Sequence, residues 1–288
     1  MQVIEHPVEK LHTALLSTRK DLIETYQQFS RPEKTLLEEG LVPGNSLFKP
    51  ITINSDSDWI PAHPEDPQDF QSFYVNPYRR SPSSGHNTIY IQTIGELLNF
   101  LKKKKPRDAF CIVGITMIDL YPRDSWNFVF GQASLTEGMG VFSFARYDDH
   151  FYQRSYAGRL KKKIKLKQGD YSVFEDYYTP PVTSTLLLRS CKTLTHEIGH
   201  IFGVKHCQWL NCVMQGSNHL EESDRRPLDL CPICLRKLQS AIGFKIADRY
   251  KALLHWLEDG QHSKPTQAFQ DYKHWLYKCL RILEGETS

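Results

Sequence analysis

The chain has 288 residues, of which 40% are hydrophobic and 24% are charged, and its net charge is +3. This length can bury a sizeable core in one large domain or two modest ones, and the composition is typical of a globular protein. The small positive charge does not indicate nucleic acid as a partner, and no apolar run approaches the ~20 residues of a transmembrane helix. Because the N-terminus carries Glu5 and Glu9 without an unbroken apolar stretch, we expect no signal peptide and an intracellular location, cytoplasmic or nuclear.

Apolar residues at helical spacing predict two helices near the N-terminus, over residues 8–26 and 31–39. Residues 50–84 are rich in Pro, Ser, Asp and aromatic residues, which indicates an irregular segment that packs through its aromatic side chains. A strand is predicted over residues 89–94. A short helix is predicted over residues 96–104, and Pro106 would prevent it from continuing further.

The middle of the chain is predicted to form a buried sheet. Residues 109–115 are almost continuously apolar, a pattern typical of a strand covered on both faces. Further strands are predicted over residues 128–130 and 141–147, followed by a long surface segment over residues 148–180. The clearest helix of the chain is predicted over residues 182–202, where an apolar stripe ends at a glycine.

Two more helices are predicted near the C-terminus, over residues 232–257 and 266–283. The predicted fold class is α/β (α+β). Residues 1–86 would form an N-terminal helical and irregular extension, residues 87–245 the α/β domain and residues 246–288 the C-terminal helices.

The most informative motif is His196-Glu197-x-x-His200-x-x-Gly203-x-x-His206. Side chains four residues apart lie on the same face of a helix, so His196 and His200 can bind one metal ion. Gly203 would end the helix and let the chain turn back, which brings His206 in as a third ligand. Glu197 would lie beside the ion and accept a proton from a water molecule on it. Five fixed positions within eleven residues make ordinary helix histidines an improbable alternative.

A second motif follows directly, with Cys207 and Cys212 separated by four residues and Cys231 and Cys234 by two. Four thiolates with this spacing are typical of a structural zinc site, which has no open position for a substrate. Such a site would hold the loop that carries His206. Four reduced thiols without a metal, or a redox pair formed by Cys231 and Cys234, are the alternatives.

The segment HEIGHIFGVKHC-x4-C-x-M-x16-C-x-x-C resembles the archaemetzincin (archaelysin) family of zinc metallopeptidases, and Met214 matches the position of the family's Met-turn. The resemblance extends to DSDWI, to PEDPQDF and to the long segment ITMIDLYPRDSWNFVFGQASLTEGMGVFSFARY, which look like the vertebrate type-2 branch of the family. It implies a zincin-like metzincin domain with a twisted mixed sheet and an active-site helix. It also implies two zinc ions, one catalytic and one structural, and an aminopeptidase-like activity on small peptides.

Two further features concern the resemblance. Residues 140–146 resemble the edge strand along which such enzymes bind an extended peptide. In addition, full-length relatives carry a long block where Ile94 and Gly95 here run straight into Glu96, so we expect a shortened isoform, as alternative splicing would produce. Lost sheet and core would weaken the scaffold around the site.

Three functions are therefore compared. The first is a zinc-dependent metallopeptidase, a monomer that acts on peptide substrates without nucleic acid or membrane as partners. The second is a zinc-binding but catalytically weak or inactive isoform that acts as an interaction protein. Nucleic-acid binding through the cysteines and the basic residues 102–105 and 159–167 ranks last, because basic runs are usually solvated faces.

Overall fold

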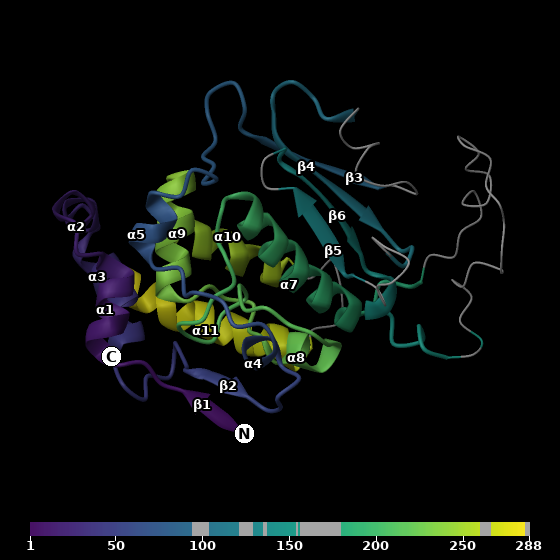
Figure 1. The fold of residues 1–288 in the computed structure, drawn as a ribbon, viewed down its shortest axis with the longest axis horizontal. Coiled ribbons are helices and arrows are strands. Elements are labelled where there is room, and N and C mark those ends of the chain that lie inside the picture. The colour runs from purple at the N-terminus through teal and green to yellow at the C-terminus, as the bar shows by residue number, and fades with distance from the viewer. Residues whose placement is uncertain are drawn as a thin grey trace. The chain divides into compact units, whose positions relative to one another are not determined.

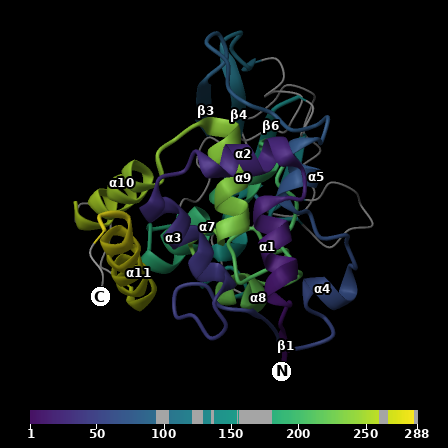
Figure 2. The same ribbon diagram turned by 90° about the vertical axis from the view of Figure 1, so that its left-hand side faces the viewer.

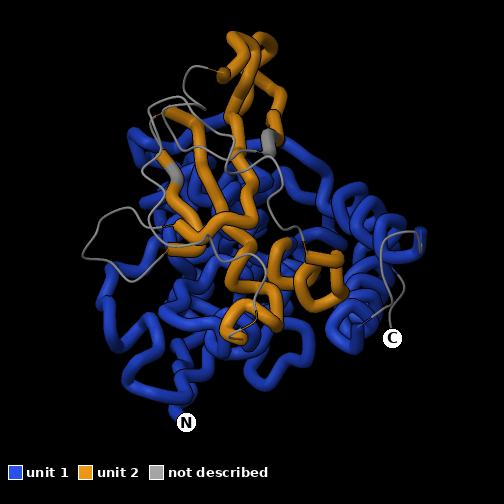
Figure 3. The backbone as a smooth tube through the Cα atoms, turned by 90° about the vertical axis from the view of Figure 1, so that its right-hand side faces the viewer, with its two compact units in different colours: residues 1–81, 191–288 blue, residues 82–190 orange. Residues whose placement is uncertain are grey.

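The computed structural model describes residues 1–93, 104–120, 129–134, 137–153, 155, 180–259 and 266–285 (Figure 1). The chain forms two compact units: residues 1–81 together with 191–288, and residues 82–190 (Figure 3). The first unit thus joins the two ends of the chain, and the three-part division stays a prediction. Among the helices of the described residues, none combines the length and the apolarity needed to cross a bilayer.

The second unit contains a four-stranded mixed sheet, which confirms the predicted α/β class. Its strands are β3 (Thr88–Thr93), β4 (Ala109–Thr116), β5 (Gly131–Ser134) and β6 (Met139–Ser143), in the order β3-β4-β6-β5. β3, β4 and β6 run parallel, whereas β5 is antiparallel to β6. The apolar run of β4 is buried along nearly its whole length, as the sequence predicts.

The structure corrects two predictions about the last strands. β6 ends at Ser143 and a 3-10 turn, Ala145–Tyr147, follows it, so the predicted strand over residues 141–147 extends too far. β6 also lies between β4 and β5, so residues 140–146 do not form an edge of this sheet. The antiparallel pairing of β5 takes up the backbone groups that an edge strand would offer to a peptide.

Helix α9 (Pro232–Ile242) forms the centre of the first unit. It packs against α1 (Val8–Leu16), α3 (Arg31–Glu38) and α5 (Phe70–Tyr74), which surround it in Figure 2. The buried Arg236 of α9 donates to backbone carbonyls at the end of α1 and in α2 (Lys20–Gln27), and its guanidinium stacks on the ring of Phe70. One polar side chain thereby connects the N-terminal helices to the C-terminal part of the chain.

Two predicted helices are each divided in two. Residues 8–26 form α1 and α2, which are separated at Ser17, a residue in the left-handed region with φ 79°. Residues 232–257 form α9 and α10 (Ile246–Glu258), which are separated at Gly243 with φ 82°. Gly243 has the left-handed conformation typical of a helix C-cap, and its amide donates to the carbonyl oxygen of Gln239 at 2.7 Å. The prediction of one continuous helix over each range is therefore wrong, although most residues of both ranges are helical.

Two other predicted helices are confirmed. α7 (Ser184–Ile201) carries the first motif, and α11 (Gln267–Leu283) packs against α10 and α3.

The predicted irregular segment contains only short elements. β2 (Ile51–Ile53) pairs with β1 (Gln2–Ile4), and α4 (Trp59–Ala62) is a single turn. The rings of Phe70 and Phe73 in α5 are buried, which confirms that the segment packs through aromatic side chains. Three predicted features lie wholly or almost wholly outside the described residues: residues 96–103 of the helix predicted over 96–104, the join at Ile94–Gly95–Glu96 and the basic residues 159–167.

Candidate metal centres

The three histidines of the first motif come together in the first unit. His196 and His200 lie one turn apart on α7, and Gly203 ends the helix in the left-handed region with φ 94°. A Cβ atom on Gly203 would lie 3.0 Å from Cα of Arg79, so both the turn and the packing require glycine there. After this turn the chain brings His206 back, and one nitrogen from each histidine lies within 4.8 Å of the others.

The hydrogen bonds of the first two histidines fix which nitrogen faces the centre. Nδ1 of His196 lies 2.9 Å from the carbonyl oxygen of Val213, and Nδ1 of His200 lies 2.6 Å from that of Val204. A carbonyl oxygen has no proton to give, so each Nδ1 carries the hydrogen and each Nε2 presents a lone pair. Burial lowers the pKa of both imidazoles, that of His200 to about 4, so both rings are neutral at pH 7.

These neutral rings fit a metal ion. The two Nε2 atoms lie 2.9 Å apart with their lone pairs towards each other, which is repulsive without a cation between them. A tetrahedral zinc with Zn–N near 2.1 Å would separate such nitrogens by about 3.4 Å, so small ring rotations would accommodate it. The three-nitrogen set leaves one tetrahedral position open, as in catalytic zinc sites.

Glu197 follows His196 on α7 but is not part of this set, because the converging ligand atoms come from the three histidines alone. Burial raises the pKa of its carboxyl to about 7, while the positive charge of Arg226 acts in the opposite direction. A carboxylate with a pKa near neutrality can both accept and return a proton at physiological pH. A nearby metal ion would favour the charged form further.

Arg226 is a buried residue of this centre that the sequence did not predict. Its Nη1 donates to the carbonyl oxygen of Gln215 at 2.6 Å and its Nη2 donates to Oγ of Ser223 at 2.8 Å. Nη1 also lies 3.1 Å from Nδ1 of His196. Because that nitrogen already donates to Val213, this approach acts through charge, which disfavours a second proton on the ring.

Met214 lies against the helix that carries the first two histidines. The side chain is fully buried, and a Cβ atom on Gly199 would lie 2.5 Å from its sulfur. The carbonyl oxygen of Met214 accepts the amide of Cys207 at 2.8 Å. The residue that resembles a Met-turn is thus placed between the helix and the loop of the third histidine.

The four cysteines of the second motif form a separate, closed cluster. All four are buried, and their sulfurs lie within 4.8 Å of one another. The sulfurs of Cys207 and Cys231 are 3.6 Å apart, close to the ~3.8 Å expected for two thiolates on a tetrahedral zinc with Zn–S near 2.3 Å. Sγ of Cys212 accepts amide hydrogens from Met214 at 3.4 Å and from Cys231 at 3.3 Å.

Neighbouring thiols and burial shift the pKa values of three of these cysteines. Hydrogen bonds from the other three thiols lower the pKa of Cys207, whereas burial raises the pKa of Cys212 and of Cys231. One thiolate surrounded by thiols is the arrangement that a soft divalent cation stabilises by replacing the protons. The donor set therefore fits zinc, and its four ligands leave no open position.

A third group, Asp58, His219 and Glu222, also brings ligand atoms within 4.8 Å of one another. Its carboxylates already have hydrogen-bond donors. Arg225 donates to Asp58 at 2.7 Å, and Glu222 accepts the amides of Trp59 and Asn218, each at 2.7 Å. The guanidinium supplies the positive charge that a metal ion would bring, so this cluster is a structural hydrogen-bond network.

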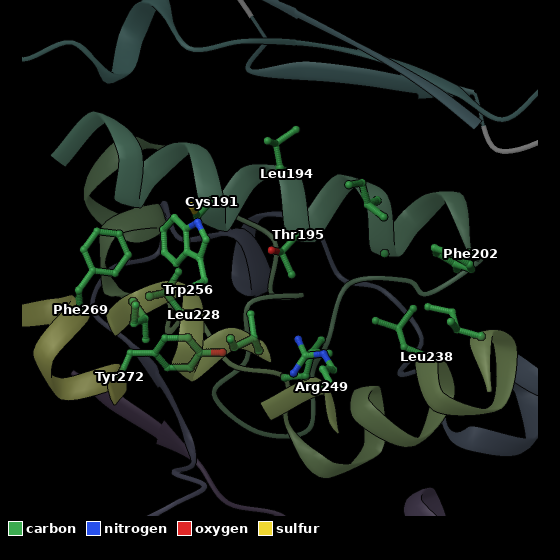
Figure 4. A pocket seen from close by; sticks show the side chains of 16 residues that line it. Cys191, Leu194, Thr195, Phe202, Leu228, Leu238, Arg249, Trp256, Phe269 and Tyr272 are labelled. Atoms are coloured by element: carbon green, nitrogen blue, oxygen red, sulfur yellow. The ribbon is translucent and has the colours of Figure 1, made fainter. Parts of the chain in front are cut away.

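The face of α7 away from the histidines lines an apolar cavity of about 400 Å³ (Figure 4). Thr195 of α7 and Phe202, which directly follows this helix, line it on one side, and Trp256, Phe269 and Tyr272 line it from α10 and α11. None of the three histidines lines it, so this cavity is not the metal centre.

Comparisons with known proteins identify a family and several relatives. The family model described as Peptidase family M54 matches residues 132–240. Archaemetzincin-2 of Macaca fascicularis is 49% identical over 359 residues, which cover 99% of this chain and 100% of that protein. Human archaemetzincin-2 is 48% identical with the same coverage. A solved structure titled zinc-dependent peptidase from Methanocorpusculum labreanum is 29% identical, with a TM-score of 0.33, and covers 44% of this chain and 53% of that chain.

The alignments also reveal a difference in length. The 359 aligned positions exceed the 288 residues of this chain by 71, so at least that many positions of these relatives have no counterpart here. The identity of nearly one half nevertheless extends over the whole length of the relatives. The chain therefore belongs to the archaemetzincin family of zinc-dependent metallopeptidases.

Proposed function

We propose that the chain hydrolyses peptide bonds at the three-histidine centre, where His196, His200 and His206 hold a catalytic zinc and Glu197 is the general base. The observation that carries this proposal is the convergence of three histidine nitrogens, with Glu197 next to His196 on the same helix. The Nδ1 hydrogen bonds support it, because they aim Nε2 of both helix histidines at the common centre.

The residues divide the chemistry between them. A zinc ion bound there would lower the pKa of a water molecule from ~15.7 towards about 7 and polarise the peptide carbonyl. Glu197 would take the proton at its carboxylate and return it to the nitrogen of the leaving amine. The charge of Arg226 favours the carboxylate form of Glu197, which is the form that a base requires.

We propose that Cys207, Cys212, Cys231 and Cys234 hold a second, structural zinc. This ion would tie the loop of His206 to the start of α9, because Cys207 directly follows His206 and Cys231 caps the helix. Two zinc ions per chain are therefore expected. Met214 would pack against α7 and so support the two histidine ligands on this helix.

The proposed substrates are small peptides with a free N-terminus, cleaved in an aminopeptidase-like manner by a monomer. The resemblance to the family supports this activity. Peptides with free and with acetylated N-termini distinguish it from internal cleavage. The seven cysteines are free thiols, four of them in one cluster, which fits the reducing environment of the cytoplasm or nucleus. Cell fractionation would test this location.

The central test is the Glu197→Gln variant. The variant should keep both metal ions, because Gln removes only the proton acceptor, and peptide hydrolysis should fall by roughly 10²–10⁴-fold. Metal analysis and a peptide-library assay measure the two effects. Equal turnover by the variant and the wild-type chain would refute the proposal.

The second candidate is a zinc-binding chain without efficient catalysis. The at least 71 aligned positions without counterpart here favour it, because part of the relatives' scaffold is absent from this chain. A folded chain with two zinc ions that cleaves none of the library peptides would support this second function.

A further inference from the structure

We propose that Glu65 is a positioning residue that orients the third histidine of the catalytic site. Glu65 belongs to residues 59–68, which we call the strap because they cross the loop that carries His206. The inference rests on the proposed function, since it assumes that His206 binds the catalytic metal.

The first observation is the bond between the two side chains. Nδ1 of His206 lies 2.9 Å from Oε1 of Glu65 and 3.3 Å from Oε2. An ionised carboxylate only accepts hydrogen bonds, so Nδ1 carries the proton and Nε2 is left with its lone pair. His206 therefore presents the same nitrogen to the centre as His196 and His200.

The partner of His206 differs in kind from those of the other two histidines. His196 and His200 donate to backbone carbonyls of the segment 204–213, which is close to them in the chain. The partner of His206 is a charged side chain 141 positions earlier. A carboxylate behind an imidazole makes the far nitrogen a stronger donor to a cation and partly balances the charge of the ion.

Glu65 is itself held in place by Trp59. The indole Nε1 donates to Oε1 of Glu65 at 3.1 Å, and the indole ring meets the ring of His206 edge-on with 4.7 Å between their centroids. The carboxylate is therefore fixed between the indole and the imidazole. Its side chain is 30% exposed and that of His206 20%, so the pair is partly shielded from water.

The strap is bonded to the loop on both sides of His206. Before His206, the side chain of Gln68 donates to the carbonyl oxygen of Gly203 at 3.1 Å and accepts the amide of Lys205 at 3.0 Å. After His206, the side chain of Gln208 donates to the carbonyl oxygen of Glu65 at 2.7 Å.

Two further side chains fix the end of the strap. Trp209 Nε1 donates to the carbonyl oxygen of Gln68 at 2.9 Å, and the buried ammonium of Lys237 on α9 contacts the same oxygen. With these bonds on either side, the distance between Glu65 and His206 is set by the surrounding structure. The carboxylate is held where it can orient the ring.

The test measures metal binding by the full-length chain. Apo protein is titrated with Co²⁺, because thiolate-bound and histidine-bound cobalt absorb differently and the two centres can be followed separately. Affinities for Zn²⁺ follow from competition with a chelator. The variants are Glu65→Gln, which keeps an acceptor oxygen but removes the charge, and Glu65→Ala, which removes both. Asp66→Asn is the matched control: it removes one negative charge from an exposed residue of the strap that directly follows Glu65.

Loss of a carboxylate behind a metal-bound histidine weakens metal binding by roughly 10–100-fold. We expect this loss at the histidine centre of Glu65→Ala, a smaller loss in Glu65→Gln and none in Asp66→Asn. The cobalt spectrum of the histidine centre should change in both Glu65 variants, while the four-cysteine centre binds as in the wild-type chain.

Wild-type affinity and spectrum in both Glu65 variants would overturn the positioning role and leave the proposed function standing. A wild-type chain whose cysteines bind cobalt while its histidines bind none would refute the proposed function, and the role of Glu65 with it. Equal weakening in Asp66→Asn would also overturn the inference, because the effect would then be one of general charge.

Discussion

The two candidate metal centres are adjacent in the chain at His206 and Cys207, yet they are built differently. The cysteine cluster has four buried ligands and no open position. The histidine centre has three candidate ligands, of which only His196 is buried, and Glu197, outside this set, follows His196 on α7. Closed four-ligand sites are structural, whereas three-ligand sites leave room for a water molecule or substrate. The number and burial of the ligands thus assign the two centres different roles.

The largest effect on stability is expected from opening the closed centre with Cys231→Ser. Structural zinc binding is worth on the order of 10–16 kcal/mol in small zinc domains, so its loss should destabilise the first unit by several kcal/mol. His200→Ala should remove one metal ion as well but leave the fold in place, because the remaining helix contacts persist. Metal analysis together with chemical unfolding compares the two variants.

Cys191→Ala is the matched control for this comparison, because Cys191 lies outside the cluster. The variant should retain both metal ions. If Cys231→Ser lost a metal ion without any change in unfolding, the cysteine centre would not be structural.

A smaller effect is expected from Gly199→Ala, which probes the packing beneath the histidine centre. The added methyl group would lie 2.5 Å from Sδ and 2.8 Å from Cε of Met214. Overpacking of this kind costs about 1–3 kcal/mol, which the free energy of unfolding measures.

The double variant Gly199→Ala/Met214→Ala tests the contact directly. Removing the methionine should relieve the clash, so the two costs should not be additive. Additive costs would show that Met214 does not pack against α7 at this point.

The smallest effect concerns acid stability at Asp58, the residue before α4 and the strap. Burial raises the pKa of this carboxyl, but hydrogen bonds from the Asn54 amide, Arg225 and His219 outweigh it, so the net pKa lies below the usual value. Because the folded-state pKa is lowered, the stabilisation is present at neutral pH and is lost as the pH falls through that pKa. Glu222 is the other charged group of this network.

Asp58→Asn should therefore be less stable than the wild-type chain at pH 7. The difference should begin to shrink below about pH 4, where the carboxyl of the unfolded wild-type chain takes up a proton, and should disappear once the pH falls through the lower pKa of the folded state. Free energies of unfolding as a function of pH provide the measurement. An unchanged difference throughout the acid range would contradict the assignment.

The sequence by itself identified the members of both clusters, because their spacing is local. Two histidines one helical turn apart and a glycine three residues later place three ligands within eleven residues. The buried run of β4 and the helix around His196 were predictable for the same reason, since hydrophobic periodicity is carried by neighbouring residues.

Only the tertiary structure decided what surrounds these ligands. Glu65 lies 141 positions before His206, and Arg226 lies 30 positions after His196, so no spacing in the sequence connects them. At the helix break, Ser17 bonds likewise to a side chain far along the chain, that of Gln71, and the interior position of β6 follows from its pairing with both β4 and β5. Local patterns determine which residues can bind a metal, whereas contacts between distant segments determine how firmly each ligand is held.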